Sequence, residues 1–207
     1  MNKNIIYKGA EAEIVLSEYL GKKVVQKKRV TKSYRIKEID SQLIASRTKE
    51  EAKLISEARK SGVSVPLLYD IDLQKGILTM QYLNGKRIKD IINDLGESKR
   101  KNLCIKIGES IAKLHNCNII HGDITTSNMI LLDDRIYFID FGLGSKCDEI
   151  EARGVDLHVL MEAFESTHSK YPQCFKYVLE GYKKGYSSNA NAVINKIDDI
   201  VRRGRYR

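Results

Sequence analysis

Two polar motifs on either side of a short strand-like stretch constrain this chain more than any other feature. The first motif runs His121-Gly122-Asp123-Ile124-Thr125-Thr126-Ser127-Asn128, and the second is Asp140-Phe141-Gly142. Between them, two apolar runs flank the turn residues Asp133 and Asp134, a pattern that indicates a β-hairpin. With a hairpin between the motifs, we expect Asp123, Asn128 and Asp140 to converge at one site.

These motifs resemble the catalytic loop H-x-D-x-x-x-x-N and the metal-binding D-F-G of protein kinases. Asp123 would accept or orient an attacking hydroxyl, and Asn128 would return on the same loop to ligate a metal ion. Asp140 would hold magnesium against the β- and γ-phosphates of ATP. Either motif alone is also compatible with an ordinary turn. Both motifs in this order predict an ATP-dependent phosphotransferase.

A kinase also needs a lysine on its third strand to hold the α- and β-phosphates. Apolar pairs separated by Gly9 and Gly21 predict three strands, and Lys27 lies at the end of the third. Lys28 is the alternative. Strand alternation favours Lys27, because it shares a face with Val25 while Lys28 would point to solvent.

The carboxylate partner of this lysine is expected on the helix that follows. Helical spacing begins at Thr48, and Glu51 shares one face with Leu54, Ile55 and Ala58, so Glu51 is expected to point inward. Thr48 and Glu51 also have the spacing of a capping box, in which Glu51 would bond back to the helix start. We favour the ion pair with Lys27, and the sequence leaves both readings open.

The remaining nucleotide contacts are expected in a phosphate loop and a hinge. The phosphate loop is expected in residues 7–13, around Gly9, Ala10 and Glu11, and it has one glycine where the kinase motif G-x-G-x-x-G has three. The backbone therefore approaches phosphate less freely, and Glu11 or Glu13 adds negative charge nearby. The hinge is expected at Met80, Gln81 and Leu83, where backbone groups of Gln81 and Leu83 would bond the adenine edge.

The chain changes character near residue 83, from strands with one helix to mainly helices. We therefore predict an α+β, bilobal, protein-kinase-like fold. Residues 1–83 would form a small β-rich N-lobe with the nucleotide-binding sheet, and residues 84–207 a mostly helical C-lobe. Only residues 143–155 separate D-F-G from Asp156, and there is no A-P-E motif. The C-lobe is therefore expected to be reduced, without an ordinary activation segment.

Composition sets the broad class. The chain has 42% hydrophobic and 30% charged residues, which favours a globular protein. The sequence contains no run of about 18 apolar residues, which a membrane span would need, and its N-terminus has no apolar signal region. We therefore expect a cytoplasmic location without membrane contact. The formal charge of +9 is concentrated at residues 22–32 and 202–207, and such basic clusters attract polyanions.

Several further stretches resemble one subfamily. They are Gly9-Ala10-Glu11-Ala12, Tyr34-Arg35, Arg47-Thr48 with Glu51-Ala52, the loop from His121 to Asn128, Gly154-Val155-Asp156-Leu157, and the basic ending 202–207. These stretches run over nearly the whole chain, and together they resemble the small atypical serine/threonine kinase and ATPase subunit of the KEOPS complex. This subunit is a RIO-kinase-like branch of the protein kinases that works in threonylcarbamoylation of tRNA.

The resemblance implies ATP and Mg²⁺ as cofactors, and the tRNA-threonylcarbamoylating subunit and other KEOPS subunits as partners. ATP hydrolysis would regulate that partner, with serine/threonine phosphorylation as the second possible output. The basic C-terminal tail, residues 202–207, carries four arginines and Tyr206 and is expected to contact tRNA phosphates.

Two other functions remain as alternatives. Small-molecule phosphotransferases of the aminoglycoside-kinase type also carry H-G-D and a downstream Asn, but they usually have a larger helical C-lobe with an acidic pocket. A nucleotide-binding scaffold without turnover would have no need of Lys27, Asp123, Asn128 and Asp140 together.

Overall fold

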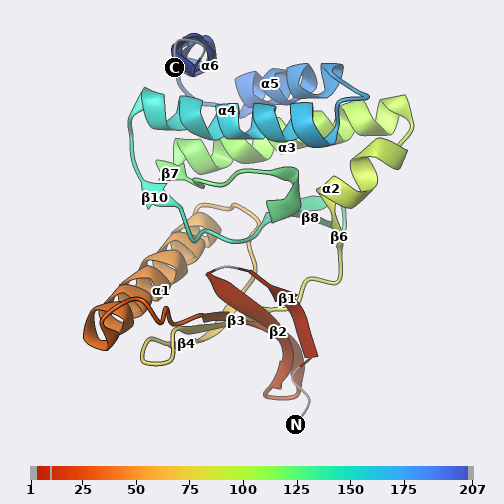
Figure 1. Ribbon diagram of the computed structural model, residues 1–207. Helices are drawn as coiled ribbons and strands as arrows, with labels where there is room; N and C mark the ends of the chain where they lie inside the picture. The colour runs from red at the N-terminus through yellow and green to blue at the C-terminus, as the bar shows by residue number, and fades with distance from the viewer. Residues whose placement is uncertain (1–3, 10, 205–207) are drawn as a thin grey trace. The chain divides into compact units, whose positions relative to one another are not determined.

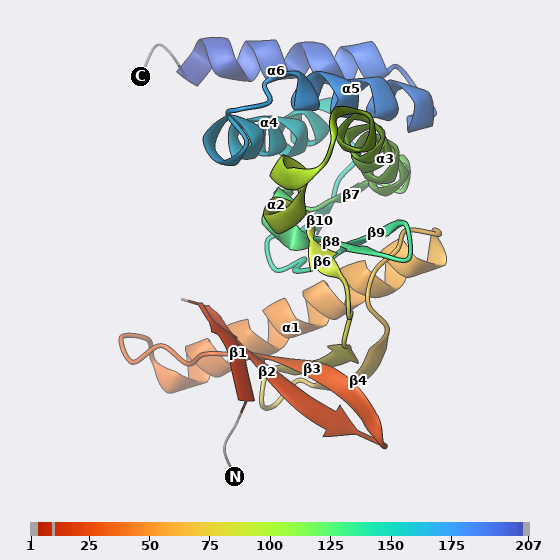
Figure 2. The ribbon, with the colours of Figure 1, turned by 90° about the vertical axis from the view of Figure 1, so that its right-hand side faces the viewer.

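The computed structural model describes residues 4–9 and 11–204, which form two compact units (Figures 1 and 2). The first unit comprises the chain up to Glu57 together with Pro66–Asn84. The second comprises Ala58–Val65 and the chain from Gly85 onward. One unit is built on an antiparallel sheet and the other is mostly helical, which confirms the predicted α+β class. The single lobe boundary at residue 83 remains a proposal, because segment 58–65 belongs to the second unit.

The first unit is organised around a five-stranded antiparallel sheet in the order β1-β2-β3-β5-β4. Its strands are β1 (Asn4–Lys8), β2 (Ala12–Tyr19), β3 (Lys22–Arg29), β4 (Leu68–Asp72) and β5 (Ile77–Gln81). Leu20 and Gly21 both have positive φ angles, 50° and 72°, and form the two-residue turn between β2 and β3. Strand β3 pairs with β2 on one side and β5 on the other, which places Lys27 in an interior strand.

Helix α1 (Lys37–Lys60) runs along one face of this sheet (Figure 2). The sequence pattern placed the helix start at Thr48, which is wrong by eleven residues. The first turns of α1 are largely exposed and Ile44 is the first buried apolar residue, so they lack the apolar spacing that marks a packed helix. Glu38 and Asp40 lie in the first turn, where carboxylates interact favourably with the helix dipole.

The second unit combines short strands with four longer helices among the residues described. Its elements are β6 (Lys86–Arg87), α2 (Ile88–Ile91), η1 (Ile92–Asp94), α3 (Glu97–Asn116), β7 (Ile119–Ile120), η2 (Thr126–Asn128), β8 (Met129–Leu132), β9 (Arg135–Phe138), β10 (Ser145–Lys146), α4 (Ile150–Thr167), α5 (Gln173–Gly185) and α6 (Ala190–Gly204). Strands β6, β8 and β9 form one small sheet, and β7 pairs with β10. The described helices include none long and apolar enough to cross a membrane.

Helices α3 and α5 pack side by side, and α6 lies against α4 (Figure 1). The α3–α5 approach depends on two glycines. A β-carbon added at Gly108 of α3 would overlap the carbonyl oxygen of Val178, and one added at Gly181 of α5 would overlap the carbonyl oxygen of Ile105. The two backbones are therefore closer than any side chain at these positions would allow.

We predict that Gly108→Ala lowers the free energy of unfolding by about 3 kcal/mol or slightly more, because the obstacle is backbone and cannot rotate away. Gly204→Ala is the matched control, since a β-carbon added at the end of α6 would meet no atom of the described residues within 4 Å. Chemical denaturation monitored by circular dichroism measures both variants. Equal stability of the two variants would show that the α3–α5 contact tolerates a methyl group.

Candidate active site

The first unit contains a buried carboxylate held by two cations. The Nζ of Lys27 lies 2.6 Å from Oε1 of Glu51, and the Nη2 of Arg29 lies 2.6 Å from Oε2. Lys27, Arg29 and Glu51 are each no more than 6% exposed. Each carboxylate oxygen thus accepts its own charge-assisted hydrogen bond, which fixes the position of Glu51 on α1.

This geometry bears on both alternatives that the sequence left open. Lys28 is exposed on the opposite face of β3, as strand alternation indicated. Thr48 lies inside α1, where its hydroxyl donates to the carbonyl of Ile44 at 2.7 Å. It therefore does not begin a helix, and the structure has the Lys27–Glu51 ion pair in place of a capping box.

Arg29 is a residue that sequence reasoning missed. It lies two positions after Lys27 and therefore on the same face of β3, which is the signal that identifies it. Its guanidinium also approaches Glu11, at 3.9 Å, and Arg47 of α1 lies 3.2 Å from the same carboxylate. The negative charge that Glu11 brings to the predicted phosphate loop is thus balanced by two arginines.

The other residues of the predicted nucleotide site also lie in the first unit. The amide of Gly9 donates to the carbonyl of Ala12 at 2.9 Å, which closes a tight turn between β1 and β2, and Ala10 lies outside the described residues. Met80 and Gln81 end β5, and Leu83 follows. The amide of Gln81 donates to the carbonyl of Leu67 at 2.8 Å, so this amide is already engaged within the first unit.

We predict that Glu51→Gln lowers the free energy of unfolding by about 3–5 kcal/mol, because it removes the charge of the buried carboxylate to which two buried cations bond. The matched control is Glu50→Gln, the exposed neighbour on the same helix, for which a change within about 0.5 kcal/mol is expected. Urea denaturation of both variants at neutral pH tests this. Similar losses for both would mean that the ion pairs contribute nothing specific.

In the second unit, the structure brings together the predicted catalytic residue Asp123 and the predicted metal ligand Asn128, and the second predicted metal ligand, Asp140, follows a residue that bonds to Asn128. The Nδ2 of Asn128 donates to the backbone carbonyl and to Oδ2 of Asp123, both at 2.9 Å. The amide of Ile139 donates to the carbonyl of Asn128 at 3.0 Å. Asp140 follows directly, so the strand pair β8–β9 returns it to the loop that carries Asp123.

Asp140 is exposed and has a left-handed backbone, with φ of 64°. A non-glycine residue in this region costs free energy and is often found at functional sites. Its Oδ1 accepts the amide of Gly142 at 3.2 Å. Phe141 is buried with its ring 4.7 Å from that of His121, so the D-F-G segment is anchored by its middle residue.

The loop that carries Asp123 is held by Asp156, a buried residue of α4. Oδ2 of Asp156 accepts the amide of His121 at 2.7 Å, and Oδ1 accepts the amide of Gly122 at 2.8 Å. Burial alone would raise the pKa of Asp156, but the hydrogen bond and charge of His115 and the interactions of His121 outweigh it and hold the pKa below its ordinary value. The sequence offered Asp156 only as part of a family motif.

His121, the first residue of the catalytic-loop motif, braces the same loop. Its Nε2 donates to the carbonyl of Ile139 at 3.1 Å, which ties the catalytic loop to the strand before Asp140. Burial lowers the pKa of His121, so the ring is neutral at physiological pH. A neutral ring adds no positive charge beside Asp123.

The side chains of Asn128 and Asp140 are suitable ligands for a magnesium ion. The Nδ2 of Asn128 donates to Asp123, which leaves its Oδ1 to coordinate a cation, and Asp140 supplies a carboxylate. Mg²⁺ is usually bound by one or two such oxygen ligands together with phosphate oxygens and waters. The donor set therefore suits a hard cation that arrives with a phosphorylated ligand.

Residues 5–176 match the family model described as the RIO domain. The chain belongs to the RIO domain family. This confirms the resemblance drawn from the motifs, and it assigns both the sheet unit and most of the helical unit to one RIO domain.

Two curated relatives extend the RIO assignment over almost the whole chain. It is 50% identical to a probable bifunctional tRNA threonylcarbamoyladenosine biosynthesis protein of Methanobrevibacter smithii, over 98% of the chain and 37% of that protein. It is 44% identical to the KEOPS complex subunit Bud32 of Pyrococcus abyssi, over 98% of the chain and 96% of that protein. The chain thus spans little more than a third of the first relative and nearly all of the second.

The RIO domain also resembles a solved structure, the Rio2 kinase–ADP/Mg²⁺–phosphoaspartate complex of Chaetomium thermophilum. The TM-score is 0.62 with 16% identity, and the match covers 93% of this chain and 64% of that one. At this identity the likeness concerns the fold, and it confirms the predicted kinase-like architecture.

Proposed function

We propose that this chain is an ATP-dependent kinase or ATPase that serves as a regulatory subunit in KEOPS-dependent formation of threonylcarbamoyladenosine in tRNA. The observation that carries the proposal is the Asp123–Asn128 pair, joined through Ile139 to Asp140. Phosphoryl transfer requires a group that orients the nucleophile and groups that ligate the metal, and Asp123, Asn128 and Asp140 supply them. The names of the Methanobrevibacter smithii and Pyrococcus abyssi relatives support the biological setting.

Each candidate residue has a role in this proposal. Lys27, positioned by Glu51, would hold the α- and β-phosphates of ATP, and Asp140 with Asn128 would ligate Mg²⁺, which neutralises charge on the phosphates when bound. Asp123 would orient the attacking hydroxyl or water. The adenine and loop contacts proposed are Gly9, Ala10, Glu11, Met80, Gln81 and Leu83.

The output of the site is proposed to be mainly ATP hydrolysis, with serine/threonine phosphorylation as the second activity. The segment between the D-F-G motif and α4 contains only short strand β10 and loop residues, so it has little length for the segment that positions peptide substrates in ordinary kinases. The partner proposed for regulation is the tRNA-threonylcarbamoylating subunit. A cytoplasmic location remains a prediction from the sequence.

We predict that Asp140→Asn abolishes magnesium-dependent ATP turnover, since it removes the negative charge of the carboxylate proposed to ligate Mg²⁺, while asparagine tolerates the left-handed backbone at this position. Asp123→Asn is expected to lower turnover by about 100-fold or more with little change in ATP affinity, because its carboxylate acts on the nucleophile. Phosphate release and nucleotide titration measure the two effects. Asp133→Asn, in the exposed β8–β9 turn, removes a carboxylate as a matched control.

These variants also separate the proposal from its main alternative. If Asp140→Asn turned over ATP like the wild type, alone and with the partner subunits, the assignment of the metal site would be wrong. If no variant or wild-type preparation released phosphate while nucleotide still bound, the chain would be a nucleotide-binding scaffold.

The C-terminal tail is retained as a proposed tRNA contact, with a change in its extent. The basic pattern of the sequence assigns Arg202 and Arg203 to the tail, but both lie in the last turn of α6. There Arg202 pairs with Asp199 and Arg203 pairs with Glu151. Residues 205–207 lie outside the described residues. Exposed arginines can keep such pairs or exchange them for phosphates, since surface ion pairs are weak.

We predict that deleting residues 205–207 weakens tRNA binding and reduces the dependence of log affinity on log salt concentration, while basal ATP hydrolysis stays near normal. This deletion spares the α6 ion pairs, and deletion of 202–207 then measures the added contribution of Arg202 and Arg203. Fluorescence anisotropy with labelled tRNA at several salt concentrations is suitable. Unchanged affinity and slope in both deletions would exclude the tail as an RNA contact.

A further inference from the structure

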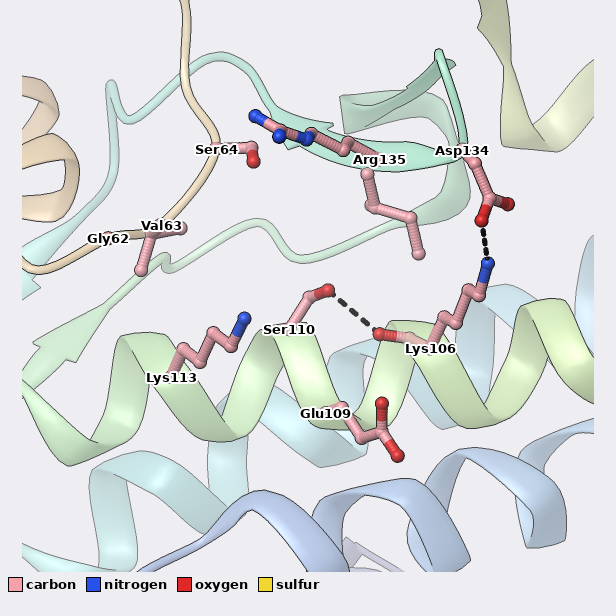
Figure 3. Close-up of a pocket in the computed structure, with 10 residues that line it drawn as sticks. Gly62, Val63, Ser64, Lys106, Glu109, Ser110, Lys113, Asp134 and Arg135 are labelled. Carbon is pink, nitrogen blue, oxygen red and sulfur yellow. Dashed lines mark hydrogen bonds and ion pairs between the residues drawn. The ribbon is translucent and has the colours of Figure 1, made fainter.

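A cavity that contains no residue of the proposed active site lies entirely within the second unit. It has a volume of about 380 Å³ and is bounded by α3, the 62–64 loop and the β8–β9 hairpin (Figure 3). This volume is within the range of about 300–1,000 Å³ found for small-molecule sites. We call it the Lys113–Arg135 pocket.

Backbone hydrogen bonds hold the 62–64 loop that forms one wall of this pocket, and one of these bonds joins the loop to a strand far away in sequence. The amide of Phe138 donates to the carbonyl of Ser64 at 3.0 Å, which joins the 62–64 loop to β9. The amide of Val63 donates to Ala58 at 3.0 Å, and Val63 and Ile136 are buried. The cavity is therefore preformed, so a ligand need not order its walls.

Basic side chains approach the pocket from two elements. Lys106, Ser110 and Lys113 follow one another at i, i+4 and i+7 along α3. Lys106 pairs with Asp134, so its charge is already balanced. Within residues 4–9 and 11–204, neither Lys113 nor Arg135 forms an ion pair, and Figure 3 shows the Lys113 ammonium directed into the space that Arg135 borders near Ser64.

One carboxylate besides Asp134 lines the pocket, that of Glu109. Figure 3 shows it on α3 below Ser110. With Lys106 paired to Asp134, the other charged residues that line the pocket are Glu109, Lys113 and Arg135, so two cations stand against one carboxylate and the pocket has an excess of positive charge. Such a site suits an anion with several oxygens, because the arginine fork bonds two oxygens at once and lysine adds a point charge.

We propose that the Lys113–Arg135 pocket binds a phosphate group of an RNA backbone. Phosphate has the charge and the oxygen geometry that the two cations require. The net charge of +9 favours a polyanion over an isolated small anion, since the surrounding field attracts the whole chain of phosphates. This contact is additional to the C-terminal tail and uses no residue of the nucleotide site.

The test compares Lys113→Gln and Arg135→Gln with Lys176→Gln, which removes one exposed charge from α5 outside the pocket. Binding of a labelled tRNA transcript to the 207-residue chain is measured between about 50 and 200 mM salt. Each pocket variant is expected to weaken binding by about fivefold or more at low salt and to reduce the salt slope by roughly 0.7–0.9. Lys176→Gln is expected to change affinity less than twofold.

Basal ATP hydrolysis and thermal melting of the same variants establish that the fold is intact. Inorganic pyrophosphate, used as a small competitor, is expected to displace RNA from the wild type more effectively than from the Lys113→Gln/Arg135→Gln double variant. Pocket variants that behave like Lys176→Gln would overturn the proposal. If the pocket variants lost pyrophosphate binding but bound RNA as tightly as the wild type, the pocket would bind a phosphate that does not come from RNA, and the proposal would be wrong.

Discussion

The helical unit depends on one buried carboxylate, Asp156. Its two oxygens accept consecutive amides of the loop that precedes Asp123, and His115 of α3 approaches one of the same oxygens at 3.3 Å. A loop in this position would otherwise have amides buried without partners, which is costly in the protein interior. By satisfying them from α4, Asp156 fixes the backbone of the loop and joins it to two helices. The short segment after D-F-G can then be irregular without loosening the site.

The sheet unit uses the opposite arrangement, with one anion between two cations. Glu51 is bonded by Lys27 and Arg29 from one strand, so the lysine is not its only support. If Lys27 turned toward a phosphate, Arg29 would still hold Glu51 in place and keep its charge compensated. Breaking a buried pair is expensive because an uncompensated charge remains. The second cation lowers that cost and lets Lys27 change partner while α1 remains anchored.

The sequence predicted the local features best where chemistry and periodicity agree. The order of Asp123, Asn128 and Asp140 around a hairpin was readable because fixed spacing and turn residues coincide, and Lys27 was readable from strand alternation. The start of α1 was not, because its first turns are exposed and carry no apolar stripe. Arg29 was missed although strand alternation places it on the face of Lys27, because the kinase motifs call for only one cation on this strand. Asp156 was harder still, because its role depends on the amides of a loop 35 residues away. That pairing has no local signal in the sequence around Asp156.

The close packing of α3 and α5 limits which amino-acid substitutions this sequence can accept during evolution. Gly108 and Gly181 each face a backbone carbonyl of the other helix, so neither position can be relieved by trimming a neighbouring side chain. Most core substitutions can be offset by a smaller residue opposite, but here the obstacle is the peptide itself. Any lineage that replaces either glycine must move a whole helix. These two positions should therefore change more slowly than the larger apolar residues around them, and they would report on shared ancestry even where the rest of the interface has been rebuilt.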